Sequence, residues 1–279
     1  MHSYTAAQAQ AIASHDRTLQ IIACAGSGKT QVISQRIAEI FQRPGVTPSN
    51  IVAFTFTEKA AAELKERVLG IVGADGGDTT GLAEMFIGTM HAYCLDVLQT
   101  HVPQTFKYSV LTEITQRLLI DRNSRRSGLT LTPAVVKGET RNLRRYVNSG
   151  LYAQVLSVLA EDDADKDLVP AQVLESQYMY KTLLREHAYF DYTMMLELAV
   201  ELLEADEHDP DAAALVGHVR DAVRFVVVDE YQDVNPLQER LVAALVRFGA
   251  NLCVVGDDDQ TIYQWRGSAV SNILTFADR

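Results

Sequence analysis

Apolar and polar positions along this chain predict a core of strands separated by helices. Short apolar runs occur at residues 19–22, 51–57 and 225–228, each of strand length and rich in β-branched or aromatic side chains. Residues 252–256 and the shorter stretch 85–88 have the same character. Helical periodicity separates these runs. Strands that alternate with helices predict an α/β fold with a parallel sheet, whose ligands bind at the carboxyl ends of the strands.

Several helix ends carry recognisable capping residues. Thr57 is placed to cap a helix over residues 58–68. Asn235 and Pro236 mark the start of a later helix, which Gly249 ends. These signals place helices directly after two of the predicted strands.

The pattern changes between about residues 101 and 187, where helical periodicity dominates and no strand is predicted. We interpret this segment as a mostly helical subdomain inserted into the core. The interpretation divides the chain into a first core part at residues 1–100, the inserted subdomain at 101–187, and a second core part at 188–279.

The inserted segment carries a basic cluster at residues 107–150, with nine basic and three acidic residues and a net charge of +6. Because the whole chain carries −11, the remainder carries −17. Arg141, Arg144 and Arg145 have the i, i+3, i+4 spacing of one helix face. Such a face suits contacts with backbone phosphates, and a plain solvated surface is the alternative.

Composition places the chain among globular proteins, since 47% of its 279 residues are apolar and 22% are charged. The net acidic charge argues against general affinity for polyanions. Three distant cysteines without metal-ligand spacing indicate a reducing compartment. No apolar run approaches the roughly 18 residues of a membrane span, and the N-terminus lacks a signal-peptide pattern. We therefore expect a soluble cytoplasmic protein with no membrane partner.

A glycine-rich loop, residues 23–30 with the sequence ACAGSGKT, joins the first predicted strand to a helix. Gly26 and Gly28 allow its N–H groups to point at an anion, and the helix N-terminus adds partial positive charge. Lys29 is placed to reach the β- and γ-phosphates of a nucleotide, and the Thr30 hydroxyl to bind Mg²⁺. An ordinary glycine-rich turn is the alternative. The candidate nucleotide contacts are Ala25, Gly26, Ser27, Gly28, Lys29 and Thr30.

Two carboxylates, Asp229 and Glu230, follow the buried run at residues 225–228. Asp229, at a strand terminus, is placed to hold the Mg²⁺ that Thr30 touches. Glu230 is positioned to orient and deprotonate an attacking water, and Gln260, after the next strand, to sense the γ-phosphate. An acidic pair also suits a surface turn, but together with the phosphate loop it predicts a nucleotide-hydrolysis site.

Two further features suit recognition of bases. Gln8, upstream of the phosphate loop, has an amide that can read a base edge, although a glutamine on a polar helix face is usually solvated. Tyr263, Trp265 and Arg266 offer two aromatic faces and a guanidinium close to the predicted nucleotide site. Stacking on such a platform holds single-stranded nucleic acid without sequence preference, and packing inside the protein is the alternative.

The order and spacing of these motifs resemble the N-terminal motor half of UvrD/PcrA/Rep-type superfamily 1 DNA helicases. The matching stretches are residues 4–8, 23–30, 55–61, 88–91, 228–233 and 256–267. The resemblance implies a RecA-like P-loop NTPase domain that binds ATP and Mg²⁺, with adenine recognised by Gln8. It implies Glu230 as the catalytic base, with Lys29 and Gln260 as further catalytic residues. The residues that it places along the path of single-stranded DNA are Phe56, Thr89, Tyr263, Trp265 and Arg266.

The resemblance further implies a 3′→5′ DNA helicase or translocase that acts on single-stranded DNA and on single-strand/duplex junctions near the nucleoid. Gln31 stands where members of the family often have an arginine near the adenine, and Met90 replaces a usual phenylalanine. Motifs of the family's second motor domain do not occur before Arg279. We therefore expect that domain as the partner within the full-length protein and slow hydrolysis by this part alone. A non-catalytic module that binds ATP and single-stranded DNA, and the motor part of a helicase–nuclease subunit, are the alternatives.

Overall fold

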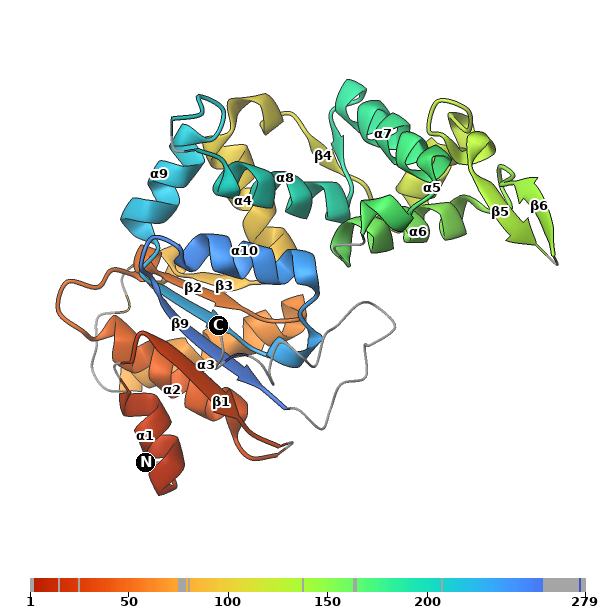
Figure 1. Ribbon diagram of the computed structural model, residues 1–279. Helices are drawn as coiled ribbons and strands as arrows, with labels where there is room; N and C mark the ends of the chain where they lie inside the picture. The colour runs from red at the N-terminus through yellow and green to blue at the C-terminus, as the bar shows by residue number, and fades with distance from the viewer. Residues whose placement is uncertain are drawn as a thin grey trace.

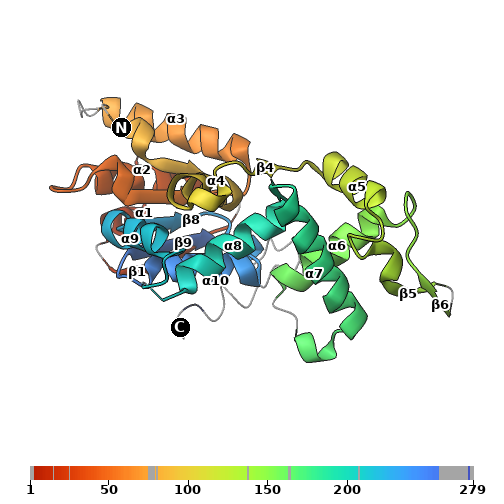
Figure 2. The ribbon, with the colours of Figure 1, turned by 90° about the horizontal axis from the view of Figure 1, so that it is seen from above.

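The computed structural model describes residues 3–14, 16–24, 26–74, 79, 81–136, 138–162, 165–206, 208–257 and 276 (Figure 1). A sheet core with helices on both faces forms one part of the molecule. An elongated insertion projects from this core in both views (Figures 1 and 2). No helix within the described ranges is both long enough and apolar enough to cross a bilayer.

Five parallel strands form the core sheet in the order β1-β9-β8-β2-β3. Their bounds are Thr18–Ile22 for β1, Ile51–Phe54 for β2, Phe86–Gly88 for β3, Phe225–Val228 for β8 and Asn251–Gly256 for β9. The predicted α/β fold with a parallel sheet is confirmed. The apolar run that begins at Ile51 leaves the sheet after Phe54, sooner than predicted. Phe54 pairs with both Gly88 and Val228, so these three strands end level with one another.

Alternate residues of the central strands feed two apolar cores on opposite faces of the sheet. Phe225 and Val227 pack with α2 and α3, whereas Val226 and Val228 pack with the helices of the other face. Strand β8 is buried along its whole length, as a continuous apolar run predicts. The core helices are α1 (Ala6–Ala13), α2 (Lys29–Phe41), α3 (Glu58–Ala74), α4 (Met90–His101), α8 (Tyr192–Glu204), α9 (Ala213–Ala222) and α10 (Pro236–Val246).

The predicted caps of two helices are confirmed. The Thr57 hydroxyl accepts a hydrogen bond from the Ala60 N–H at 3.1 Å, and the helix that it caps runs on to Ala74, beyond the predicted end. Asn235 forms a capping box with Gln238 at the start of α10. Short 3₁₀ helices occur at Pro48–Asn50, Leu82–Glu84, Pro103–Thr105, Leu129–Leu131, Lys166–Leu168 and Tyr231–Asp233.

The insertion leaves and rejoins the core at a small parallel sheet, in which Ser109 pairs with Tyr189 and Val110 with Phe190. Its buried side chains, including Ile120, belong to the same apolar cluster as α8. The elements of this region are β4 (Ser109–Val110), α5 (Glu113–Arg122), β5 (Pro133–Val136), β6 (Glu139–Asn142), α6 (Ser149–Glu161), α7 (Ala171–Glu186) and β7 (Tyr189–Phe190).

Two predictions for the insertion are wrong. Strands β5 and β6 form an antiparallel hairpin at its far end (Figure 2), where no strand was predicted. Arg141 lies on β6, and Arg144 and Arg145 lie in the turn after it, so the three do not share a helix face. Every residue of β6 is exposed, so no alternation of buried and exposed positions marks it as a strand. Gly138 takes up a φ of 80° in the turn between the strands.

Candidate active site

The glycine-rich loop lies between the end of β1 and the first turn of α2. Gly26 and Gly28 have φ values of 73° and 87°, in the left-handed region that favours glycine. A Cβ at Gly28 would lie 3.2 Å from Nε2 of Gln8, so the close approach of that side chain also favours glycine. Lys29 and Thr30 begin α2, where the free N–H groups of a helix favour an anion. Ala25 lies outside the described residues.

Gln8 lies against this loop. Its Nε2 donates to the Ser27 carbonyl at 2.9 Å, and its Oε1 accepts from the Thr5 N–H at 2.9 Å in the capping box of α1. Beside it, Gln31 Nε2 donates to the Tyr4 hydroxyl at 3.2 Å. Gln8 of α1, Gln31 of α2 and Tyr4, which precedes α1, thus place two glutamine amides and a tyrosine near the phosphate loop.

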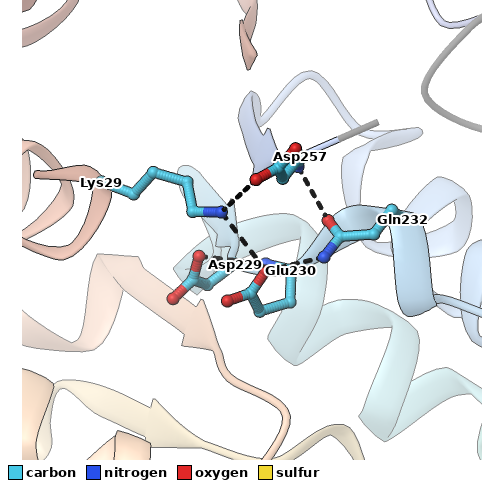
Figure 3. Close-up of polar contacts among 5 residues, drawn as sticks. All are labelled: Lys29, Asp229, Glu230, Gln232 and Asp257. Atoms are coloured by element: carbon cyan, nitrogen blue, oxygen red, sulfur yellow. Dashed lines mark hydrogen bonds and ion pairs between the residues drawn. The ribbon is translucent and has the colours of Figure 1, made fainter. Parts of the chain in front are cut away.

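Two strand ends bring carboxylates to Lys29 (Figure 3). The Lys29 Nζ lies 3.7 Å from Glu230 Oε2, after β8, and 3.7 Å from Asp257 Oδ2, after β9. Gln232 links these two residues, because its Nε2 donates to Glu230 Oε2 at 2.7 Å and its Oε1 accepts from the Asp257 N–H at 3.1 Å. The lysine of the loop and the predicted base are therefore brought together.

Glu230 has an unusual backbone. Its φ of 52° and ψ of 44° lie in the left-handed region, which costs a residue with a Cβ on the order of 1–3 kcal/mol. Its N–H donates to Asp229 Oδ1 at 3.0 Å, and its side chain is 37% exposed. The sharp turn directs consecutive carboxylates differently, with Asp229 largely enclosed and Glu230 open to solvent.

Burial and mutual repulsion shape the electrostatics of this cluster. Burial, reinforced by the charge of Glu230, raises the pKa of Asp229 to about 6, and Lys29 opposes the shift. The same causes raise the pKa of Asp233 to about 6. Carboxylates therefore crowd around the Lys29 ammonium. Hard oxygen donors with surplus negative charge, at the ends of β8 and β9, suit Mg²⁺.

Asp257 and Gln232 did not emerge from the sequence analysis as site residues. Asp257 is almost fully buried and directly follows β9, so the rule that ligands gather at the carboxyl ends of parallel strands points to it. Gln260, Tyr263, Trp265 and Arg266, which sequence reasoning selected, lie outside the described residues.

A cleft of about 620 Å³ opens beside this site, between the sheet core and the insertion. Asp229 and Glu230 line one end of it, together with Phe56 and Thr89, the two predicted DNA contacts that the structure describes. The insertion contributes Arg117 and one side of α6 to the opposite wall. The cleft thus continues from the strand-end carboxylates to Arg117, one member of the basic cluster of the insertion.

Two aromatic rings lie in the wall of the cleft. The ring centroids of His91 and Tyr192 lie 5.4 Å apart in an edge-to-face contact, and Tyr192 is 50% exposed. Burial lowers the pKa of His91, which favours the neutral imidazole. Phe56 is 40% exposed in the same cleft. Sequence reasoning missed Tyr192, since only the fold brings the start of α8 beside α4.

Thr89 supports the cleft wall from the start of α4. Its hydroxyl donates to Glu58 Oε1 at 2.8 Å and accepts from the Ala92 N–H at 3.2 Å, which caps the helix. These bonds join the loops that follow β2 and β3, so the two loops form one surface.

Comparison with known proteins identifies related chains. The model of the UvrD/REP helicase N-terminal domain family matches residues 4–279. The ATP-dependent DNA helicase UvrD1 of Mycobacterium leprae is 34% identical, over 96% of this chain and 35% of the relative. The ATP-dependent DNA helicases PcrA of Staphylococcus aureus and Bacillus subtilis are 30% and 31% identical, over 96% of this chain and 35% and 34% of the relatives. The chain thus spans about a third of these relatives' length.

Proposed function

This chain belongs to the UvrD/REP helicase N-terminal domain family, and we propose that it is the ATP-binding motor domain of an ATP-dependent DNA helicase. The observation that carries the proposal is the meeting of Lys29 with Glu230 and Asp257 at the ends of β8 and β9. Those three side chains come from separate parts of the sequence and converge beside a loop shaped for phosphate. Such convergence supports a nucleotide-hydrolysis site rather than a surface turn.

The phosphate loop binds the triphosphate. Its N–H groups and the N-terminus of α2 supply partial positive charge, and Lys29 supplies a full one. When the nucleotide binds, the Lys29 ammonium exchanges its carboxylate neighbours for the β- and γ-phosphates. Gln8 faces the base from its place beside Ser27. Gln31, hydrogen-bonded to Tyr4, occupies the position near the adenine where many members of the family have arginine.

Thr30 and Asp229 hold Mg²⁺. The ion, when bound, neutralises the developing charge between the β- and γ-phosphates. Burial, and after it the charge of Glu230, raise the pKa of Asp229, and a bound cation would favour its ionised form.

Glu230 acts as the general base. Its left-handed backbone directs the carboxylate toward the open end of the site, and the Gln232 amide fixes its orientation. The base needs to be ionised and within reach of the attacking water. Gln260, in the stretch after β9, is proposed to sense the γ-phosphate and report it to the DNA side.

Single-stranded DNA lies in the cleft between core and insertion. Exposed rings of Phe56 and Tyr192, together with Thr89, offer a stacking wall for bases. From the resemblance of their stretch to the family, Tyr263, Trp265 and Arg266 are proposed as further contacts to the single strand. The basic cluster at residues 107–150, on the inserted subdomain at residues 101–187, contacts phosphates of the duplex at a single-strand/duplex junction.

The second motor domain of the full-length protein completes the ATP site and converts closure into stepping in the 3′→5′ direction. Phosphoryl transfer needs a cationic side chain on the γ-phosphate beyond the loop lysine. We place the protein in the cytoplasm at the nucleoid, where DNA repair takes place. The arrangement of Glu230 favours this function over a non-catalytic module.

The test is ATP hydrolysis by the full-length protein with and without single-stranded DNA, and unwinding of duplexes with a 3′ or a 5′ tail. We expect hydrolysis to rise when DNA is added, and unwinding only of the 3′-tailed substrate. Hydrolysis that DNA leaves unchanged would contradict the helicase assignment. Unwinding of the 5′-tailed substrate alone would contradict the direction.

A further inference from the structure

Glu161, the last residue of α6, joins three helices at the wall of the cleft. Its Oε1 accepts a hydrogen bond from the Thr193 hydroxyl of α8 at 2.6 Å. Its Oε2 accepts from Nδ2 of Asn235, the N-cap of α10, at 3.0 Å. One carboxylate therefore ties the insertion to two helices of the core.

A carboxylate is an unfavourable choice for this wall unless it has a structural task. Glu161 lines the cleft proposed for a polyanion, as do the carboxylates of Glu113 and Asp233. Carboxylates repel the negatively charged phosphates of DNA, and the repulsion increases as the distance between the charges decreases. Both oxygens of Glu161 are used as acceptors for donors on other helices, which accounts for an acid at this position.

The donors on the core side are held in place by bonds of their own. Asn235 uses Oδ1 to accept the Gln238 N–H at 2.8 Å, so its Nδ2 is directed toward Glu161. Thr193 is also within 2.7 Å of the Ser157 hydroxyl, one turn earlier on α6. Asn235 lies two residues after the 3₁₀ turn Tyr231–Asp233 that follows Glu230.

We infer that Glu161 is a positioning residue that holds α6 of the insertion against the core and so sets the width of the DNA cleft. The inference rests on the proposed function, because it names a determinant of DNA binding at the same site. Glu161 acts through the position of α6 and takes no part in phosphate chemistry. Its loss therefore weakens the binding of single-stranded DNA and leaves Mg²⁺–ATP binding unchanged.

We call the two hydrogen bonds that Glu161 accepts from Thr193 and Asn235 the tether. Three variants distinguish the effect of the tether on DNA binding from the effect of the Glu161 charge. Glu161→Ala removes both acceptor oxygens, so the bonds from Thr193 and Asn235 are both lost. Asn235→Asp keeps the cap of α10, since aspartate caps as well as asparagine, and sets two carboxylates against each other. The double variant E161Q/N235D restores a bond from the Gln amide to the Asp carboxylate, with the net charge of the wild type.

Glu113→Ala is the matched control. Glu113 lines the same cleft from the exposed first turn of α5, so this change removes an identical charge without touching the bonds between α6, α8 and α10. By electrostatics alone, both E113A and E161A bind a polyanion more tightly than the wild type. The tether predicts that only E161A binds more weakly, and the opposite sign makes the two explanations distinguishable.

The experiment is a fluorescence anisotropy titration of a labelled oligothymidylate with the chain and its variants at one salt concentration. We expect E161A and N235D each to lose about fivefold or more in affinity, and the double variant to return within about twofold of the wild type. Affinity for Mg²⁺–ATP, measured by calorimetry, stays the same. E161A that binds as tightly as the wild type, or a double variant as weak as N235D, would overturn the inference.

Amide hydrogen exchange at the end of α6 reports the tether without DNA. We expect faster exchange in E161A and N235D, and wild-type exchange in the double variant. If the wild type fails to bind the oligonucleotide, the proposed function fails, and the exchange comparison still decides the role of Glu161. Unchanged exchange in the single variants would contradict the tether.

Discussion

The sheet core and the insertion differ in which side chains they bury and which they expose. Strands β2 and β8 bury every residue, and polar groups of the core converge at the strand ends around Lys29. The insertion leaves Ile114 and Leu151 more than half exposed, and Arg141 lies on an exposed strand. The core is therefore suited to grip a small anion in one geometry. The insertion is suited to present a broad surface to a large ligand.

The difference follows from how each part is held. Lys29, Glu230 and Asp257 follow strands of one parallel sheet, whose central strands β2 and β8 are buried along their whole length. The insertion meets the core through the β4–β7 pair and the bonds of Glu161. Changes in the core should thus alter chemistry, whereas changes in the cleft should alter DNA affinity.

Glu230→Gln should have the largest effect, because it should reduce ATP hydrolysis without reducing the binding of ATP or DNA. The amide keeps the shape and the hydrogen bond with Gln232 but cannot accept the proton of the attacking water. In the full-length protein we expect hydrolysis to fall by roughly 10²-fold or more, with ATP and DNA binding retained. Steady-state hydrolysis with DNA present measures this. Turnover near the wild-type rate would show that another residue is the base.

Tyr192→Ala should reduce the affinity for single-stranded DNA and leave nucleotide binding unchanged. Removal of a ring that stacks on a base costs about 1–3 kcal/mol, or roughly fivefold to 150-fold in affinity for single-stranded DNA. Tyr192→Phe serves as the control, because it keeps the ring and loses only the hydroxyl. Nucleotide affinity should not change in either variant. Equal oligonucleotide affinity of Tyr192→Ala and the wild type would remove the ring from the DNA path.

The smallest predicted effect is on the pH dependence of stability, and it arises away from both sites. There the rings of His101 on α4 and His218 on α9 stack with their centroids 4.1 Å apart. Burial lowers the pKa of both, and the neighbouring ring adds to the shift of His218, while Asp96 opposes it. Because the folded state disfavours the charged rings, the unfolded chain takes up more protons as pH falls through 6.5. The free energy of unfolding therefore decreases below that pH.

Thermal unfolding between pH 7.5 and 5.5 measures this contribution. We expect the wild type to lose on the order of 1–2 °C more than His218→Gln over this interval, since both rings are partly solvated. A wild-type midpoint that falls no faster than that of His218→Gln would contradict the assignment. DNA and nucleotide affinity should be equal in the two proteins at pH 7.5.

The core was largely predictable from the sequence because its signals are local. Continuous apolar runs mark β2 and β8, and Asn235 and Pro236 mark the start of α10. The hairpin of the insertion has no such signal, because β6 is exposed throughout and Arg141 happens to match a helical spacing. The local sequence pattern was therefore sufficient to predict the strands whose residues are all buried.

The candidate site was predictable only in part. Lys29 and Glu230 belong to recognisable stretches, so each was found before the fold brought them together. Gln232, Asp257 and Tyr192 acquire their places through contacts between distant segments, which periodicity does not encode. The cleft is the clearest example, because the core forms one wall and the insertion, which begins and ends at the β4–β7 pair, forms the other.

The central claim is that nucleotide is bound at the strand ends through Lys29, separately from DNA in the cleft. Calorimetric titration of the wild-type chain and of Lys29→Ala with Mg²⁺–ATP tests it most directly, with circular dichroism to verify folding. The account predicts that the variant loses at least about tenfold in ATP affinity, or ~1.4 kcal/mol, and keeps wild-type affinity for single-stranded DNA. ATP affinity that is unchanged in a folded Lys29→Ala variant would contradict it.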